Sequence, residues 1–128
     1  MQQSAQQLNV LKDNLSVGLH KIALQTPEAL LFILFNEILY LKADGSYTYL
    51  HLENNIKLTF SKRLSEFAAL EKTGIFMRIH YSHIINLNRI KKIKKGQSGQ
   101  LTMDDTTELA ISSKKRQALL EYAEKFKL

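Results

Sequence analysis

The 128-residue chain contains no cysteine. Disulfide bonds, thiolate metal ligands and thiol nucleophiles all need a cysteine side chain, so each of them is excluded. A chain without cysteine is also compatible with the reducing cytosol.

Long hydrophobic runs are missing as well. The longest apolar run covers residues 29–35, whereas a membrane-spanning helix needs about 20 apolar residues. The N-terminus, residues 1–7, lacks the basic region and following apolar stretch of a signal peptide. We therefore expect a cytoplasmic protein with no membrane partner.

Signatures of catalysis are absent from the sequence. No Gly-rich phosphate loop occurs, and neither Ser82 nor Ser112 has a recognisable acid and base partner. His80 and His83 are three residues apart, a spacing that places side chains of one strand on opposite faces, and no cysteine completes a metal site. We expect no enzyme activity, no cofactor and no bound metal.

The length fits a single domain, because one hydrophobic core commonly serves roughly 100 to 150 residues. Residues 1–18 carry Leu8, Leu11 and Leu15 at helical spacing among polar residues. This segment is expected to be a connector helix or linker from an upstream domain, or an interaction helix. Residues 19–128 are expected to form the main domain.

Positive charge is concentrated in the middle of the chain. The net charge is +6, and residues 61–95 contain nine Lys and Arg against two Glu. Such a segment is the electrostatic footprint of a phosphate-rich partner, although a solvated lysine face would look the same by charge alone.

Short apolar, β-branched and aromatic runs separated by turn residues predict a mostly β fold. Asn54 and Asn55 predict a tight type I′ turn, because Asn tolerates positive φ. The expected strands cover residues 21–24, 30–35, 38–42, 47–52, 56–60, 76–79, 84–87, 90–93, 101–103 and 108–111.

Two short helices are expected beside the strands. Ser61 is predicted to cap the first, which ends at Gly74, and Ser112 or Ser113 to cap the second. Their apolar faces are Leu64, Phe67, Ala68 and Leu70 in the first helix, and Leu119, Leu120, Ala123 and Phe126 in the second.

The second helix begins with Lys114, Lys115 and Arg116, where the helix macrodipole disfavours cations by about 0.3 to 1 kcal/mol each. An anion bound at this helix start would make the cations favourable instead, because the free N–H groups and the cations would converge on it. Lys91 and Lys92 in the basic segment 89–95 are expected to project from a strand anchored by its two isoleucines. The alternatives are solvated lysines at the helix start and an edge strand that uses lysine against aggregation.

Four strings resemble the LytTR family of bacterial DNA-binding domains in order and spacing. They are ILYLKADGSYTY at residues 38–49, KRLSE at 62–66, FMRIHYSHIIN at 76–86 and LAIS at 109–112, and the likeness extends over about residues 20–126. The resemblance implies an elongated arrangement of small antiparallel sheets with two short helices, whose loops enter successive major grooves. It also implies an upstream phosphorylatable receiver domain in a two-component response regulator.

The resemblance further assigns residues to roles. Base-reading positions fall near Thr48, at Tyr81 and at Ser113, and the family's commonest residue at the last two is Arg, so this chain departs from the pattern there. Losing an Arg removes a bidentate contact to guanine that provides about 1 to 3 kcal/mol of discrimination. His80, Ser82 and Asn86 match the family and are expected to hold the loop.

The sequence therefore predicts a transcription-regulating domain that binds double-stranded promoter DNA, with a homodimer on DNA as a further possibility. The alternatives are a single-stranded nucleic-acid binder that stacks bases on tyrosines, and a protein-interaction module that uses the N-terminal leucine stripe. The expected phosphate contacts are Arg63, Arg78, Lys91, Lys92, Lys114, Lys115 and Arg116.

Overall fold

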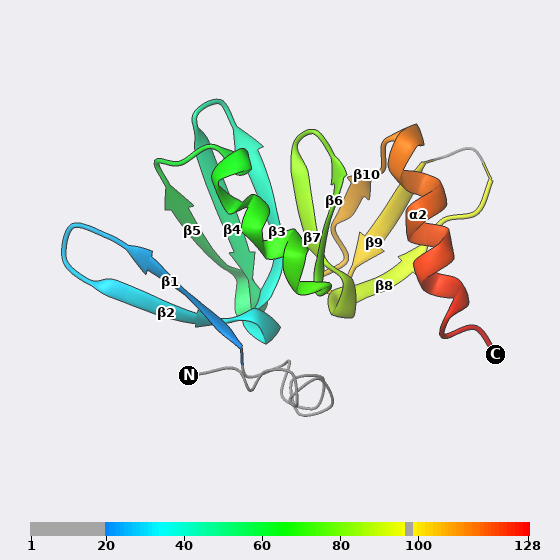
Figure 1. Cartoon of the computed structure of the whole chain (residues 1–128), viewed down its shortest axis with the longest axis horizontal. Coiled ribbons are helices and arrows are strands. Elements are labelled where there is room, and N and C mark those ends of the chain that lie inside the picture. Colours follow the sequence, from blue (N-terminus) through cyan, green and yellow to red (C-terminus); the bar gives the residue numbers. More distant parts are fainter. Residues whose placement is uncertain (1–19, 97–98) are drawn as a thin grey trace. The chain divides into compact units, whose positions relative to one another are not determined.

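The computed structural model describes residues 20–96 and 99–128 (Figure 1). The predicted connector at residues 1–18, with Leu8, Leu11 and Leu15, lies outside the described residues. The chain divides into two compact units at Ile38. No helix within the described ranges is long and apolar enough to cross a membrane.

In the first unit, β1 (Lys21–Gln25) and β2 (Leu30–Leu34) pair as an antiparallel hairpin. The Thr26 hydroxyl closes the turn by accepting a 3.0 Å hydrogen bond from the Ala29 N–H. The 3₁₀ turn η2 (Phe35–Glu37) follows, and its Glu37 carboxylate accepts from the Leu34 N–H at 2.9 Å.

A five-stranded sheet begins the second unit, in the order β5-β4-β3-β7-β6. Asn54 and Asn55 have φ values of 64° and 59°, so the predicted positive φ is confirmed. Leu52 pairs with Ile56, so three residues connect β4 and β5 rather than the two of the predicted type I′ turn. The strands are β3 (Ile38–Asp44), β4 (Tyr47–Leu52), β5 (Ile56–Phe60), β6 (Phe76–His80) and β7 (His83–Asn86), and the 3₁₀ turn between β4 and β5 is η3 (Glu53–Asn55).

The first predicted helix is present and is of the 3₁₀ type. η4 (Leu64–Thr73) is a 3₁₀ helix whose buried side chains Leu64, Phe67 and Leu70 recur every third residue, which matches three residues per turn. Ala68 is exposed, so its placement on the apolar face was wrong. Arg63 rather than Ser61 is the N-cap, and its N–H donates to Glu66 at 3.0 Å.

A three-stranded sheet in the order β10-β9-β8 follows the turn η5 (Leu87–Arg89). Its strands are β8 (Ile90–Ile93), β9 (Gln100–Met103) and β10 (Glu108–Ala110). A bulge between Ile90 and Lys92 interrupts the alternation of β8. The bulge explains how Ile90 and Ile93, three residues apart, both pack against the core.

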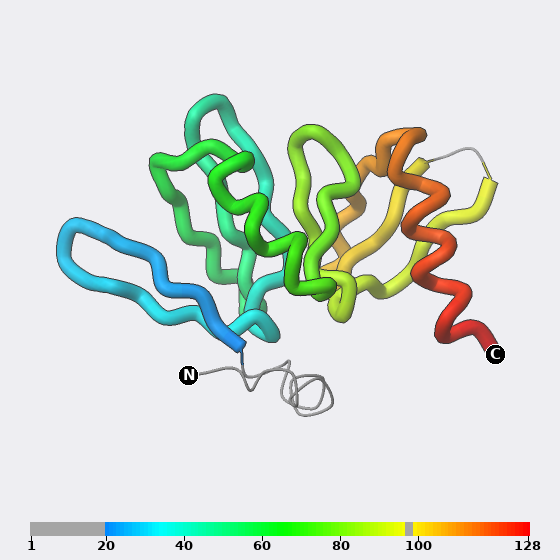
Figure 2. Tube along the Cα trace, in the orientation of Figure 1, coloured from blue at the N-terminus to red at the C-terminus, as the bar shows by residue number. Residues whose placement is uncertain are grey.

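The core of this second unit lies where β3, β6 and β7 meet β9, β10 and the helix α2 (Ser113–Glu124). Its fully buried side chains include Ile79, Ile85, Leu101, Met103 and Leu119. Figure 2 traces the chain from β7 through η5 into β8 and later from β10 into α2. The predicted mostly β fold of small antiparallel sheets with two helices is confirmed.

Candidate nucleic-acid interface

The strand order brings two turns of the second unit to one end of the five-stranded sheet. β7 pairs antiparallel with both β3 and β6, so the turn after β3 and the turn between β6 and β7 face the same way (Figure 1). The Ala43 N–H donates to the Ser82 carbonyl at 2.9 Å and fixes the two turns side by side.

Two further segments join this end. The Ser112 N–H donates to the Ile79 carbonyl at 2.7 Å, which anchors the start of α2 at the end of β6. The Thr48 hydroxyl donates to the Lys62 carbonyl at 2.7 Å, which holds the connection between β5 and η4. We call this set the turn end, and it consists of residues 44–47, 62–63, 81–82 and 113–115.

Exposed aromatic and cationic side chains lie at the turn end. Tyr81 is 79% exposed and Tyr47 is 49% exposed. Arg63, Lys114 and Lys115 are exposed as well. Exposed aromatic rings and several cations are thus presented together at one end of the fold, a combination that suits contact with a nucleic acid.

Thr48 does not fit its predicted base-reading role. Its side chain is 0% exposed and its hydroxyl is used by the Lys62 carbonyl. Tyr47, one residue earlier, projects on the opposite face of the strand and is exposed. In this turn Tyr47 is therefore the residue placed to reach a partner.

Arg78 stabilises the turn between β6 and β7. Its guanidinium donates to the carbonyl of Tyr81 and, at 3.4 Å, to that of His80. These two hydrogen bonds hold the turn, so Arg78 supports the position of Tyr81, and its role as a phosphate contact stays a prediction.

His80 and His83 lie on the same side of the sheet, so the expectation of opposite faces was wrong. They are partners across β6 and β7, joined by a two-residue turn, and their ring centroids are 5.0 Å apart. Ser82 lies between them, with its hydroxyl 2.9 Å from Nδ1 of His80 and 3.4 Å from Nδ1 of His83. Among residues 20–96 and 99–128, no group of three or more His, Asp or Glu is arranged to hold a metal ion.

His80 and Ser82 bond within the turn between β6 and β7, whereas Asn86 lies at the other end of β7 and caps the following turn. The Ser82 N–H donates to Nδ1 of His80 at 3.2 Å, so this nitrogen carries no proton in that contact. The Asn86 side chain accepts from the Asn88 N–H at 2.9 Å and caps η5.

Burial lowers the pKa of His83 from 6.5 to about 4, with smaller contributions from His80 and Lys42. Between these values the unfolded chain binds a proton that the folded chain does not, so stability should rise with pH across this window. We expect the urea midpoint to fall as the pH drops from 6.5 to 4, and to fall less in His83→Gln. An unchanged pH dependence in that variant would assign the effect to other groups.

The remaining expected phosphate contacts are not all at the turn end. Arg116 follows the turn end in sequence, but its guanidinium is directed to the segment after β8, where it donates to the Gly96 carbonyl at 2.9 Å. Lys91 lies two residues from Arg89, which forms ion pairs with Glu53 at 3.2 Å and Asp104 at 2.8 Å. Because Glu53 follows β4, this cluster is at the opposite end of the sheet, and the structure does not bring Lys91 or Lys92 to the turn end.

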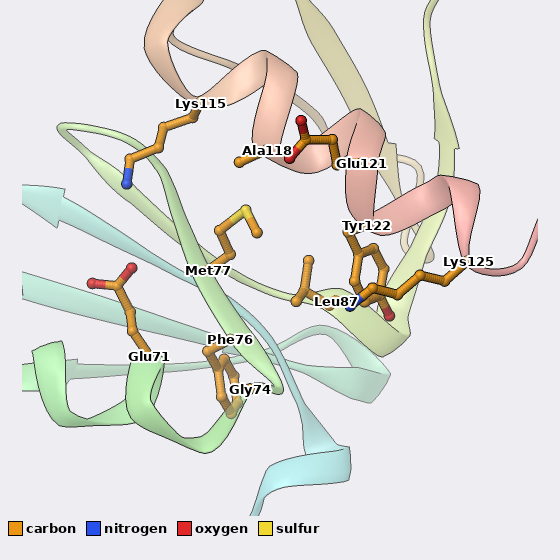
Figure 3. A pocket seen from close by; sticks show the side chains of 10 residues that line it. All are labelled: Glu71, Gly74, Phe76, Met77, Leu87, Lys115, Ala118, Glu121, Tyr122 and Lys125. Atoms are coloured by element: carbon orange, nitrogen blue, oxygen red, sulfur yellow. The ribbon is translucent and has the colours of Figure 1, made fainter.

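Lys115 also lines a cavity of about 460 Å³ between α2 and the segment from η4 to β6 (Figure 3). Glu71 and Glu121 line the same cavity together with Lys125, so its charges balance. The Glu71 carboxylate accepts from the Arg78 N–H at 2.9 Å and so belongs to the support of β6. This cavity has no preference for an anion.

Comparisons with known proteins agree with this arrangement. A family model described as the LytTr DNA-binding domain matches residues 28–124. A solved structure, named as the LytTr DNA-binding domain of a methyl-accepting/DNA response regulator from Bacillus cereus, is similar with 29% identity and a TM-score of 0.60. The similarity covers 82% of this chain and 94% of that one. No curated protein matches the chain.

Proposed function

The chain belongs to the LytTR family of DNA-binding domains, and on that premise we propose that it recognises specific sequences in double-stranded promoter DNA. The observation that supports this proposal best is the turn end, where Tyr81 and the cationic start of α2 lie together. We propose Tyr81, Ser113 and Tyr47 as the residues nearest to the bases.

The start of α2 is proposed to bind a backbone phosphate. The first N–H groups of a helix have no acceptor within the helix, and the macrodipole places positive potential there. Lys114 and Lys115 are exposed in this first turn, and no acid occurs in it. This concentration of positive charge favours a bound anion.

Arg63 extends the same surface from the connection between β5 and η4. Lys91 and Lys92, both exposed on β8, are proposed to contact a more distant phosphate. Contacts to phosphates set affinity and orientation, whereas the residues near bases set sequence preference.

The wider setting is also a proposal. We infer that the domain acts in transcription regulation as the output of a bacterial two-component response regulator, in the cytoplasm, with a phosphorylatable receiver domain upstream and a homodimer on DNA. The similar structure from Bacillus cereus is named as a domain of a response regulator, which supports this setting. We propose that the domain itself is not an enzyme.

Selection of the purified chain against a random duplex library tests the proposed specificity. We expect an enriched motif of about 9 base pairs, or two copies one helical turn apart. If about six phosphates are neutralised, log K should fall with log salt at a slope near −5. Tight binding without an enriched motif would support the proposed phosphate contacts but contradict the proposed base-reading roles.

Competition between duplex and single-stranded DNA tests which of the two forms the domain binds. Exposed tyrosines such as Tyr47 and Tyr81 could stack on unpaired bases, so a single-stranded competitor of the selected sequence is the necessary control. Duplex should displace single strand. The reverse order would identify a single-stranded nucleic-acid binder instead.

A further inference from the structure

An open groove of about 690 Å³ lies between β8 and α2. Its apolar lining comes from Ile90 and Ile93 on β8, from Leu120 and Ala123 on α2, and from Phe126 just beyond the end of α2. Phe126 is 66% exposed, and the other four side chains are only partly buried. A continuous apolar surface is therefore left uncovered by the described part of the chain.

Cations surround this apolar lining. Lys91, Lys92, Lys95 and Arg116 line the groove, whereas Glu124 is its one acid among the described residues. The Glu124 carboxylate lies 3.3 Å from the ammonium of Lys127, which neutralises it. The electrostatic potential of the groove is thus positive, which favours an anionic occupant.

Arg116 supplies a more specific contact. One terminal nitrogen of its guanidinium donates to the Gly96 carbonyl at 2.9 Å, while Nη1 is buried and has no hydrogen-bond acceptor among the described residues. A buried donor without an acceptor destabilises the fold. The guanidinium carries five N–H donors, and a carboxylate that docks at this end of the groove would accept from those that face it.

We propose that the groove is a binding site for a small amphipathic anion, an alkyl carboxylate whose chain lies along Ile90, Ile93 and Leu120 and whose head group reaches Arg116. The volume falls within the range of roughly 300 to 1,000 Å³ that is usual for small-molecule sites. DNA phosphates would account for the lysines but not for the uncovered apolar side chains. The proposal does not depend on DNA binding.

Titration of the full chain with decanoate below its micelle concentration tests the site. We expect saturable binding by calorimetry, with amide NMR shifts concentrated in β8 and α2. Decanol, which has the same chain without the charge, should bind at least about tenfold more weakly, and decyltrimethylammonium should not bind. Equal binding of all three, or shifts centred on other elements, would overturn the proposal.

Two variants locate the site. Phe126→Glu places a carboxylate at the exposed mouth of the groove, and Arg116→Gln removes the head-group cation. Each should weaken decanoate binding at least about tenfold, with circular dichroism unchanged. Lys57→Gln removes an exposed cation from β5, outside the groove, and should bind as the unmodified chain does. Equal affinity of Phe126→Glu and the unmodified chain would exclude this location.

Discussion

Replacement of Lys114 and Lys115 by glutamate is expected to weaken duplex binding by about two orders of magnitude while making the fold slightly more stable. Each contact of a cation to phosphate contributes about 1.5 kcal/mol, which is roughly tenfold in affinity. Both side chains are exposed in the first turn of α2, where acids are favoured over cations by the helix macrodipole. Binding and stability should therefore change in opposite directions.

Salt dependence distinguishes a lost phosphate contact from a lost base contact. The slope of log K against log salt should become shallower by about 2 when two phosphate contacts are lost. Sequence preference, measured on the selected motif and a scrambled duplex, should stay the same, because phosphate contacts contribute equally to both.

The same helix provides a matched control. Lys125→Glu combined with Lys127→Glu changes the net charge equally, but just beyond the C-terminal end of α2, a helix length away from the turn end. This variant should bind DNA much more tightly than the Lys114 and Lys115 variant. If both variants weaken binding equally, the effect is one of net charge and the anion site at the helix start is rejected.

The strands were predictable because their residues alternate and their turns carry a clear signal. The strands at residues 47–52, 56–60 and 90–93 have the predicted bounds, and the Asn54-Asn55 turn adopts positive φ. Ala68 was placed on the apolar face of η4 because it is apolar, but the three-residue spacing of Leu64, Phe67 and Leu70 forms a narrower face that leaves it exposed.

The candidate site was harder to predict, for two physical reasons. Thr48 alternates with Leu50, and this pattern could have placed its side chain on the buried face of β4. The second reason is topological. β3 pairs with β7, which is distant in sequence, and only this pairing brings Tyr47 and Tyr81 to one end of the sheet.

The pairing of His80 and His83 shows that the spacing of two residues predicts their faces only when both lie in the same strand. Three residues along one strand separate two side chains onto opposite faces, but three residues around a two-residue turn bring them together. The string between them contains neither Gly nor Asn, so the usual hairpin signal was absent.

Replacement of Leu119 by alanine should produce the second large effect, a loss of about 2 to 5 kcal/mol in the free energy of unfolding. Leu119 is 0% exposed and is the one side chain of α2 that is fully buried in the core beside Leu101 and Met103. Small domains have total stabilities of about 5 to 15 kcal/mol, so this substitution should remove a large part of the total. Urea unfolding followed by circular dichroism measures the loss.

Leu120→Ala is the matched control, because it deletes the same atoms one position further along the helix, where the side chain is only half-buried. Its cost should be well below that of Leu119→Ala, since fewer core contacts are lost and solvent fills the space. The Leu119 variant should also bind duplex more weakly at temperatures where it is folded, because the anchoring of α2 positions Lys114 and Lys115. Equal costs for the two alanine variants would show that α2 is held by its whole inner face rather than by Leu119.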